Sequence, residues 1–265
     1  MPNIRLVAVD EDGTFLRDHV YYDKEWFARL YERMSSLGVR FVVATGNQRY
    51  QVESLFPEYA DGMGIVSAGG AYVVDGGRDV FIAHANKEAV AHMIAACHED
   101  PSVPFAVVGV KATYIECGTS QEFFDDMAQY STRIEWVDNF SDVDDKILMF
   151  SSLVEEERVE NEIARYREVV GTHMDVTGSG GGYFDIVCPG INKAVGLKHL
   201  LDIYDIAPEE CIAFGDSDND LDMLRFVGCG YAMQNAPANV KDAADRIAPS
   251  CDESGVLQVL DELFA

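Results

Sequence analysis

The sequence has few basic residues, no long apolar run and no closely spaced pair of cysteines. Only 20 Lys and Arg stand against 46 Asp and Glu, which gives a formal net charge of −26 over 265 residues. A chain this acidic is not expected to bind nucleic acid or an anionic membrane surface. No apolar stretch approaches the roughly 18 residues of a membrane-spanning helix. The N-terminus also lacks the basic, apolar and small-residue pattern of a signal peptide.

The six cysteines are far apart and have no histidine at zinc-binding spacing. They are expected to be reduced thiols in the core rather than disulfides or metal ligands. Together with the missing signal peptide and membrane segment, this predicts a cytoplasmic protein. The composition, 48% apolar and 25% charged, is ordinary for a globular chain, and the length allows one large or two ordinary domains.

Two carboxylates follow the first apolar segment. Residues 4–9 are short, apolar and rich in branched side chains, which predicts a buried parallel strand. Asp10 would end this strand and Asp12 would lie in the loop beyond it, at the edge of the sheet where α/β proteins bind ligands. Taken alone, the segment could also be an acidic surface turn, because Asp-Gly is a common turn dipeptide.

The segments on either side of the middle of the chain predict a parallel sheet. An amphipathic helix over about 23–37 and a second buried strand at 40–44 complete a βαβ unit, and a helix at 192–202 precedes another buried strand at 211–214. Between about 84 and 189, short strands instead come in pairs between helices, near 104–109, 112–115, 134–137, 146–153, 171–176 and 183–187. That pattern is typical of an antiparallel α+β unit.

We therefore predict an α/β fold with a Rossmann-like doubly wound parallel-sheet core, formed by residues 1–83 and 190–265. Residues 84–189 would form an inserted α+β domain above the functional edge of that core. The insertion holds seven Lys and Arg against 20 Asp and Glu, so it carries half of the net negative charge.

Four motifs follow apolar strands or open helices, and together they resemble one family. They are Asp10-x-Asp12-Gly-Thr14, Thr45-Gly46, Lys193 and Gly215-Asp216-x-x-Asn219-Asp220. In these motifs the chain resembles the haloacid dehalogenase-like superfamily and, within it, the Cof-type sugar phosphatases. The resemblance covers nearly the whole chain, and the insertion matches the cap domain of that group in place and size.

The residue types support phosphoryl transfer. A carboxylate at Asp10 can attack phosphorus to form an aspartyl-phosphate, and Asp12 can protonate the leaving alcohol and later accept a proton from water. Carboxylates crowded at one edge repel one another by roughly 4 kcal/mol per pair at 4 Å, so the cluster needs a cation, and oxygen ligands with a phosphate substrate favour Mg²⁺. The resemblance implies that its ligands are Asp10, the main-chain carbonyl of Asp12, and Asp216.

The phosphate group also needs donors. Thr45 offers a hydroxyl, Gly46 allows close approach of the main chain before a helix N-terminus, and Lys193 offers a positive charge. The resemblance adds Asn219 as a residue that holds the phosphate or Asp10. Without it, Lys193 would be interpreted as a solvated surface lysine and Asn219 as a turn or cap residue. Asp220 is a candidate for a place behind the metal ligands, and Asp218 for a structural role.

Two loops depart from the family pattern. Many relatives carry Arg where this chain has Asn47, although some sugar phosphatases have Asn-Gln there. Relatives often read Glu-Asn-Gly-Ala where this chain reads Ala68-Gly69-Gly70-Ala71, so no substrate contact is carried over to that loop.

The leading hypothesis is a Mg²⁺-dependent phosphatase acting on small phosphorylated sugars, with residues 84–189 as a lid and the loop 177–183 as a candidate contact to the sugar. A phosphomutase would use the same intermediate, and a non-enzymatic phosphate-binding regulator is a third alternative. The pair Asp10 and Asp12 disfavours the regulator, because a sensor needs no general acid. The sequence names neither the sugar nor the oligomeric state.

Overall fold

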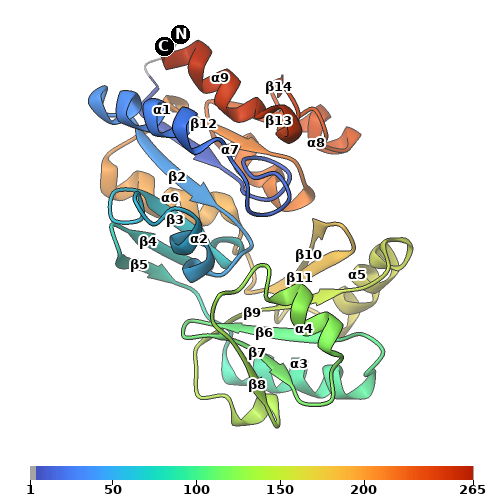
Figure 1. Ribbon diagram of the computed structural model, residues 1–265. Helices are drawn as coiled ribbons and strands as arrows, with labels where there is room; N and C mark the ends of the chain where they lie inside the picture. Colours follow the sequence, from blue (N-terminus) through green and yellow to red (C-terminus); the bar gives the residue numbers. More distant parts are fainter. Residues whose placement is uncertain (1–3, 265) are drawn as a thin grey trace.

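The computed structural model of the protein describes residues 4–264, which form two β-sheets, one above the other in Figure 1. The larger sheet has eight strands in the order β14-β13-β12-β1-β2-β3-β4-β5. Its strands are β1 (Leu6–Val9), β2 (Arg40–Ala44), β3 (Gly64–Ser67), β4 (Tyr72–Asp75), β5 (Arg78–Ile82), β12 (Cys211–Gly215), β13 (Cys229–Met233) and β14 (Arg246–Ala248). From β14 to β3 all neighbours are parallel, and β4 and β5 add an antiparallel hairpin at one edge.

Helices cover both faces of this sheet, as a doubly wound fold requires. They are α1 (Lys24–Ser36), α2 (Arg49–Leu55), α6 (Lys193–Tyr204), α7 (Leu221–Phe226), α8 (Ala238–Ala243) and α9 (Gly255–Phe264). Alternate residues of β1 point into different cores, so Val7 packs with α1 and α9 while Leu6 packs with α6 and α7. All four residues of β1 are fully buried, which explains why the strand is apolar along its whole length.

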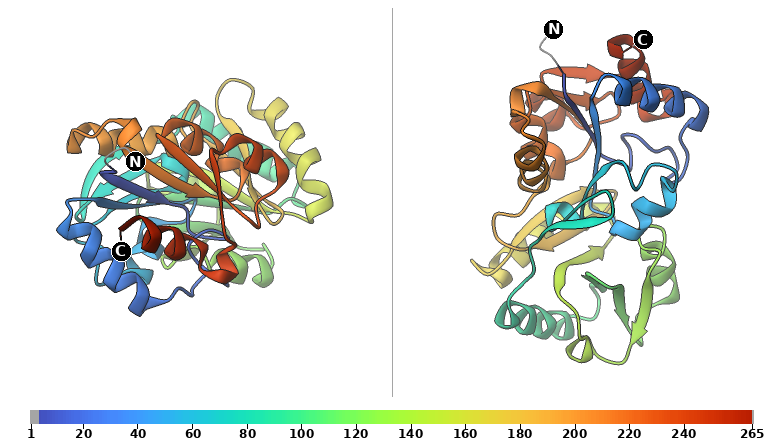
Figure 2. Two further views of the ribbon diagram at one scale, coloured as in Figure 1. Left: turned by 90° about the horizontal axis from the view of Figure 1, so that it is seen from above. Right: turned by 90° about the vertical axis from the view of Figure 1, so that its left-hand side faces the viewer.

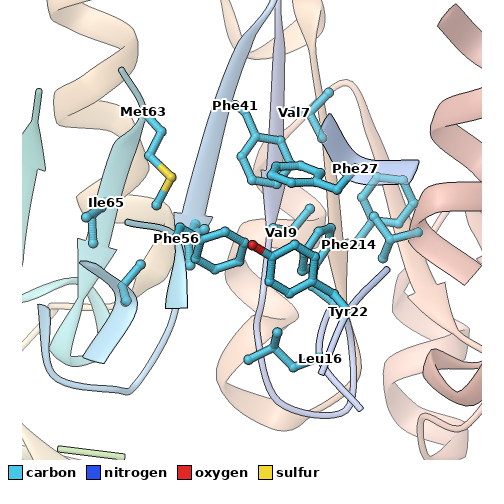
Figure 3. Close-up of a cluster of buried hydrophobic side chains, with 14 of the residues drawn as sticks. Val7, Val9, Leu16, Tyr22, Phe27, Phe41, Phe56, Met63, Ile65 and Phe214 are labelled. Carbon is cyan, nitrogen blue, oxygen red and sulfur yellow. The ribbon is translucent and has the colours of Figure 1, made fainter. Parts of the chain in front are cut away.

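The face that carries α1 is filled by aromatic side chains. Phe27 from α1 lies 5.0 Å from Phe41 of β2, measured between ring centroids, and Tyr22 stacks on Phe56 at the same distance. Figure 3 shows these rings close to Val7 and Val9 of β1, with Leu16 below Tyr22. Because Leu16 belongs to the loop that follows Asp12, this core anchors the loop at the end of β1.

The smaller sheet has six strands in the order β10-β11-β9-β6-β7-β8. They are β6 (Phe105–Gly109), β7 (Thr113–Glu116), β8 (Ile134–Val137), β9 (Ile147–Leu153), β10 (Asp175–Gly180) and β11 (Tyr183–Val187), with helices α3 (Lys87–Glu99), α4 (Gln121–Met127) and α5 (Glu156–Val170). Residues of α3 and α5 pack in one core with this sheet, and the right-hand view of Figure 2 shows α3 at the end of the molecule away from the larger sheet. We call this unit, from β6 to β11 with its helices, the cap.

The predicted fold class is confirmed, with two corrections inside the cap. The pair β7 and β8 is parallel rather than antiparallel, because α4 lies in the connection and returns the chain in the same direction. The strand expected near 171–176 is β10, Asp175–Gly180, because Gly171 ends α5 with φ 55° and a turn precedes the strand. The domain boundaries at residues 84 and 190 stay predictions.

Two further expectations can be compared with the described residues. All six cysteines are free thiols, three of them buried. Within residues 4–264, no helix combines the length and the apolar character needed to cross a membrane.

Candidate active site

The predicted site residues meet at the carboxyl ends of three adjacent strands. Val9 of β1 pairs with Val43 of β2 on one side and with Phe214 of β12 on the other. The loops that follow these strands therefore lie side by side, and they carry Asp10, Thr45 and Asp216. The cap faces this edge, and a cavity of about 510 Å³ lies between the two.

Asp10 is buried against a lysine. Its Oδ1 lies 2.6 Å from Nζ of Lys193, and the same ammonium lies 2.7 Å from Oδ1 of Asp220. Burial raises the pKa of Asp10 well above its usual range, while Lys193 opposes that shift and the Asp220 charge adds to it. Lys193 is 1% exposed, so the alternative of a solvated surface lysine is wrong. Burial disfavours its charge, but the two carboxylates raise the pKa of Lys193 above the ordinary value.

Asp216 and Asp220 come from one loop but have different environments. Asp216 accepts a hydrogen bond from Oγ1 of Thr14 at 3.0 Å, and burial together with Asp220 raises its pKa to about 7. Asp220 is fully buried; its Oδ2 accepts from the main-chain nitrogens of Asp216 and Ser217, while its Oδ1 faces Lys193. Asp220 therefore shapes the loop that presents Asp216, and both of its oxygens are already engaged.

The glycine of the first motif leaves room for this arrangement. Gly13 has φ +74°, and a Cβ at this position would lie 2.4 Å from Oδ2 of Asp216. Any other residue would displace that carboxylate and would also strain the backbone. The sequence Asp12-Gly13 is thus explained by contact with Asp216 as well as by the turn.

Asp12 lies at the cavity with both carboxylate oxygens engaged. Nδ1 of His19 is 2.8 Å from Oδ1, and Nδ2 of Asn47 donates to Oδ2 at 2.7 Å. The hydrogen bond to Asp12 is the largest cause that raises the pKa of His19. Asn47 also donates to Oε2 of Glu11, whose pKa is raised to about 8 by burial and the neighbouring Asp12 charge.

The loop after β2 is fixed by the glycine-rich turn that departs from the family pattern. Oγ1 of Thr45 accepts from the main-chain nitrogen of Asn47 at 3.0 Å. The nitrogen of Gly69 donates to the carbonyl of Thr45, and the nitrogen of Ala68 donates to that of Asn47. Gly70 has φ +105° and sits where a Cβ would be 2.1 Å from the carbonyl oxygen of Asn192, so this turn also packs against the start of α6. Its contacts are structural.

Gly46 and Asn219 also line the cavity, whereas Asp218 is exposed and accepts from Nδ2 of Asn239 at 2.6 Å. The side-chain oxygen of Asn219 accepts from Oγ of Ser217. The predicted residues are thus together at one edge, with Lys193 behind Asp10 rather than in the wall of the cavity.

The donor set suits a hard cation. Oxygens of Asp10, Asp216 and Asp220 lie within 4.8 Å of one another. Burial and the neighbouring carboxylates raise the pKa values of Asp10 and Asp216. A divalent cation would neutralise the excess negative charge of these crowded carboxylates. All-oxygen ligands of this kind fit Mg²⁺.

Three side chains on the opposite wall of the cavity come from the cap: Tyr130, Tyr183 and Asp185. The sequence alone did not identify Tyr130 or Asp185 as site residues, and it placed Tyr183 only at the end of the loop 177–183. Tyr130 follows α4 and packs edge-on against Tyr183 of β11, with 5.3 Å between ring centroids. Asp185, also on β11, is 6% exposed and accepts from Oγ of Ser179 at 2.5 Å. Burial raises the pKa of Asp185. A charged residue inside an apolar strand was a signal that could have identified Asp185.

Comparisons with known proteins agree with this geometry. The family model for haloacid dehalogenase-like hydrolases matches residues 7–260, so the chain belongs to that family and the predicted resemblance is confirmed. The chain is 37% identical over 266 residues to 5-amino-6-(5-phospho-D-ribitylamino)uracil phosphatase YbjI of Escherichia coli (strain K12), covering 99% of this chain and 97% of the relative.

Solved structures share the same fold. The crystal structure of SMU.1108c from Streptococcus mutans UA159 matches with a TM-score of 0.93 and 31% identity, covering 98% of each chain. The subclass IIB sugar phosphatase BT4131 matches with a TM-score of 0.83 over 98% of each chain, and at 23% identity that likeness concerns the fold alone.

Proposed function

We propose that this protein is a Mg²⁺-dependent phosphomonoesterase that hydrolyses small phosphorylated sugars and related polyols through an aspartyl-phosphate intermediate. The observation that carries the proposal is the placement of Asp10 and Asp12 at one cavity, with Asp10 held by a buried lysine and Asp12 facing the cap. A regulator that only bound phosphate would need no such pair. The cytoplasmic location stays part of this proposal, because free thiols suit a reducing compartment.

In the first step, a carboxylate oxygen of Asp10 attacks phosphorus and the bond from phosphorus to the ester oxygen breaks. The electron pair of that bond goes to the leaving oxygen, which takes the proton of the Asp12 carboxyl group. The ion pair with Lys193 supports this role, because it orients Asp10 and favours the ionised carboxylate over the protonated one.

In the second step, water attacks the phosphorus of the aspartyl-phosphate and gives a proton to Asp12. The bond from phosphorus to Asp10 breaks, its electron pair returns to the carboxylate, and inorganic phosphate is released. The two steps leave both aspartates as they began. A phosphomutase would instead return the phosphoryl group to a sugar hydroxyl, so release of free phosphate distinguishes the two.

We place Mg²⁺ among Asp10, the main-chain carbonyl of Asp12, and Asp216. When bound, the cation would offset negative charge on the transferred phosphoryl group. Asp220 supports the site through Lys193 and the main chain of the Asp216 loop. We assign the non-bridging phosphate oxygens to Thr45, Gly46 and Asn219, with the charge of Lys193 close behind.

The walls of the cavity favour a neutral leaving group. Among the described residues that line it there is no lysine or arginine, and apart from His19 the acid–base side chains are tyrosines and five aspartates: Asp10, Asp12, Asp126, Asp185 and Asp216. A substrate with further phosphates, such as a nucleoside triphosphate, would meet this negative charge without a partner outside the metal site. Hydroxyl groups suit the cap side, where Ser179 and Asp185 offer donors and acceptors.

A second candidate substrate combines a sugar-like chain with a planar ring. The relative at 37% identity is named a phosphatase of 5-amino-6-(5-phospho-D-ribitylamino)uracil. The rings of Tyr130 and Tyr183, which line the cavity from the cap, favour a planar heterocycle as part of the leaving group. The ribityl chain of such a compound would still present a primary phosphate and several hydroxyls.

The experiment is a panel of phosphorylated metabolites assayed for free phosphate with Mg²⁺ and without any bisphosphate activator. We expect kcat/KM to be higher for pentose, hexose and ribityl phosphates than for nucleoside mono- and triphosphates. Tyr183→Ala should lower kcat/KM for a ribitylamino-uracil phosphate more than for a hexose phosphate if the ring is recognised there. A clear preference for nucleoside triphosphates would contradict the substrate class, and absence of phosphate release from every compound would contradict the activity.

A further inference from the structure

Two side chains, Asn47 and His19, hold Asp12, the general acid of the proposed reaction, and His19 also contacts the cap. Asn47 donates to Oδ2 of Asp12, and Nδ1 of His19 lies at hydrogen-bond distance from Oδ1. Asn47 is fixed from its own loop, through its main-chain bonds to Thr45 and Ala68. His19 comes from a separate segment, so its position is set by other contacts.

The segment around His19 is a closed turn that presents the imidazole toward the cavity. Arg17 and Tyr21 exchange main-chain hydrogen bonds of 2.8 and 2.9 Å across the turn. Asp18 and His19, between them, have φ 48° and 62°, in the left-handed region that only a few residue types adopt readily. The turn therefore fixes the backbone of His19 without fixing its ring.

The ring of His19 packs on the cap. Tyr130 lies edge-on against the imidazole, with ring centroids 5.4 Å apart and an angle of 83° between the planes. The carbonyl of Tyr130 accepts from the main-chain nitrogen of Gln48, the residue after Asn47. Tyr130 thus lies where the cap is hydrogen-bonded to the same loop that holds the other side of Asp12.

We propose that His19 is a positioning residue for Asp12, and that its contact with Tyr130 couples the placement of the cap to the orientation of the general acid. The inference rests on the proposed function, since it assigns Asp12 the proton transfer to the leaving group. The neutral imidazole can donate through Nδ1–H, so the bond does not require a charged ring. With the cap in place, Tyr130 limits the positions of the ring, and Asp12 is aimed at the cavity by two donors.

The consequence is a dependence on the leaving group. An activated ester such as 2,4-dinitrophenyl phosphate needs little protonation in the first step, whereas phenyl phosphate needs the acid. Replacing a residue that only positions Asp12 should therefore lower the rate with phenyl phosphate and leave the rate with 2,4-dinitrophenyl phosphate unchanged. A residue with a merely structural role would lower both rates by the same factor.

The experiment measures phosphoenzyme formation with these two esters by rapid quench, in the wild type and in variants of His19 and Tyr130. His19→Ala should slow the step with phenyl phosphate by about tenfold, a part of the 10²–10⁴-fold that general acids supply, and should change the step with 2,4-dinitrophenyl phosphate by less than about twofold. His19→Asn keeps a residue type that tolerates the left-handed backbone but shortens the side chain, so the same loss is expected. His19→Gln restores a longer donor and should recover part of the rate.

Tyr130 variants test the coupling to the cap. Tyr130→Ala should lower the rate with phenyl phosphate by a smaller factor than His19→Ala does, and should leave the rate with 2,4-dinitrophenyl phosphate nearly unchanged. Tyr130→Phe keeps the ring, so both of its rates should remain close to those of the wild type. The matched control is His173→Ala, an exposed histidine of the cap, which should change neither rate.

The outcomes separate the two hypotheses. If the wild type forms no phosphoenzyme with either ester, the proposed function fails, and the inference fails with it. If the wild type does form it but His19→Ala lowers both rates equally or neither, the positioning role is overturned while the function stands. If His19→Ala is selective and Tyr130→Ala is not, the coupling to the cap is overturned.

Discussion

The core wall and the cap wall of the cavity differ in the interactions that their side chains make. On the core side, Asp10, Asp216 and Asp220 are engaged by Lys193, Thr14 and main-chain nitrogens, and their bonds join strands that are far apart in the sequence. On the cap side the wall holds polar, aromatic and apolar groups, with Asp126 and Asp185 as its carboxyl groups, and Asp185 accepts a hydrogen bond from Ser179.

The difference suggests a division of labour. Under the proposed function, the core wall binds one group, a phosphate with its cation, and each of these three carboxylates has a partner that limits its position. In the proposed reaction, the cap wall faces the part of the substrate that lies beyond the phosphate. Substitutions on the core side should therefore affect all substrates alike, and those on the cap side should affect substrates differently.

The largest effect is expected for Asp10→Asn. An amide cannot attack phosphorus, so turnover of every substrate should fall on the order of 10⁴-fold or more, as for other covalent nucleophiles. The measurement is phosphate release across the panel, with circular dichroism to confirm the fold. Undiminished release from any substrate would contradict the mechanism.

Asp12→Asn sharpens that result because it removes the acid and base without removing the nucleophile. With 2,4-dinitrophenyl phosphate the variant should still form the aspartyl-phosphate but lose it slowly, since water then lacks a base. Trapping of phosphate on the protein after acid quench tests this. Absence of any trapped intermediate under all conditions would count against two steps.

The next largest effect concerns the cation. EDTA should abolish activity and Mg²⁺ should restore it, whereas Ca²⁺ should support it poorly because it prefers larger and less regular coordination. Asp216→Asn should lose activity at all practical Mg²⁺ concentrations. Asp218→Asn, a change in the same loop at an exposed residue bonded to Asn239, is the matched control and should remain active. Full activity in EDTA would refute the metal assignment.

A smaller but distinct effect is expected on stability from Lys193. Replacing it by Met leaves Asp10 and Asp220 buried without their cation, and breaking a buried ion pair in this way costs about 3–5 kcal/mol. Lys198→Met, on the exposed face of the same helix, removes only a surface pair with Asp202, worth roughly 0.3–0.5 kcal/mol. Urea unfolding measures both. Equal free energies of unfolding for the two variants would contradict the buried role of Lys193.

The residues of the core wall could be predicted from the sequence because they lie at or directly after the ends of buried strands. Asp10, Thr45 and Asp216 each end or follow a buried parallel strand, and parallel strands bring such ends to one edge. The ion pair between Lys193 and Asp10 was not predictable from periodicity, because it depends on how α6 packs against the sheet. The family resemblance pointed to Lys193, and the structure placed it behind Asp10.

The cap side was less predictable for a physical reason. Its groups reach the cavity from a helix end and from a hairpin, and their position depends on how the cap packs on the core. Tyr130 is set by one main-chain bond to Gln48 and by packing with Tyr183, neither of which leaves a pattern in the sequence. His19 was missed because its turn has no motif, and only the fold brings it to Asp12.

The smallest effect is a dependence of metal binding on pH. In the metal-free protein the pKa of Asp216 is raised to about 7, mainly by burial and by Asp220. The ordinary pKa of an aspartate is 3.8, so between about pH 4 and 7 the folded protein holds a proton that the unfolded chain has lost. By linkage, this group makes the metal-free fold less stable as the pH rises through that range.

Magnesium should reverse that trend, because it binds the ionised carboxylate and competes with the proton. Below pH 7, each pH unit lost costs about 1.4 kcal/mol of the free energy of Mg²⁺ binding, because the cation must displace one proton from Asp216. For a chain of this size 1 kcal/mol corresponds to roughly 2–4 °C in Tm, so the rise in Tm produced by Mg²⁺ should be a few degrees larger at pH 7.5 than at pH 6. Differential scanning calorimetry measures it, and Asp216→Asn should remove the dependence. A Mg²⁺-induced shift equal at both values in the wild type would mean that Asp216 is already ionised at pH 6 and that the core wall carries more negative charge than this pKa implies.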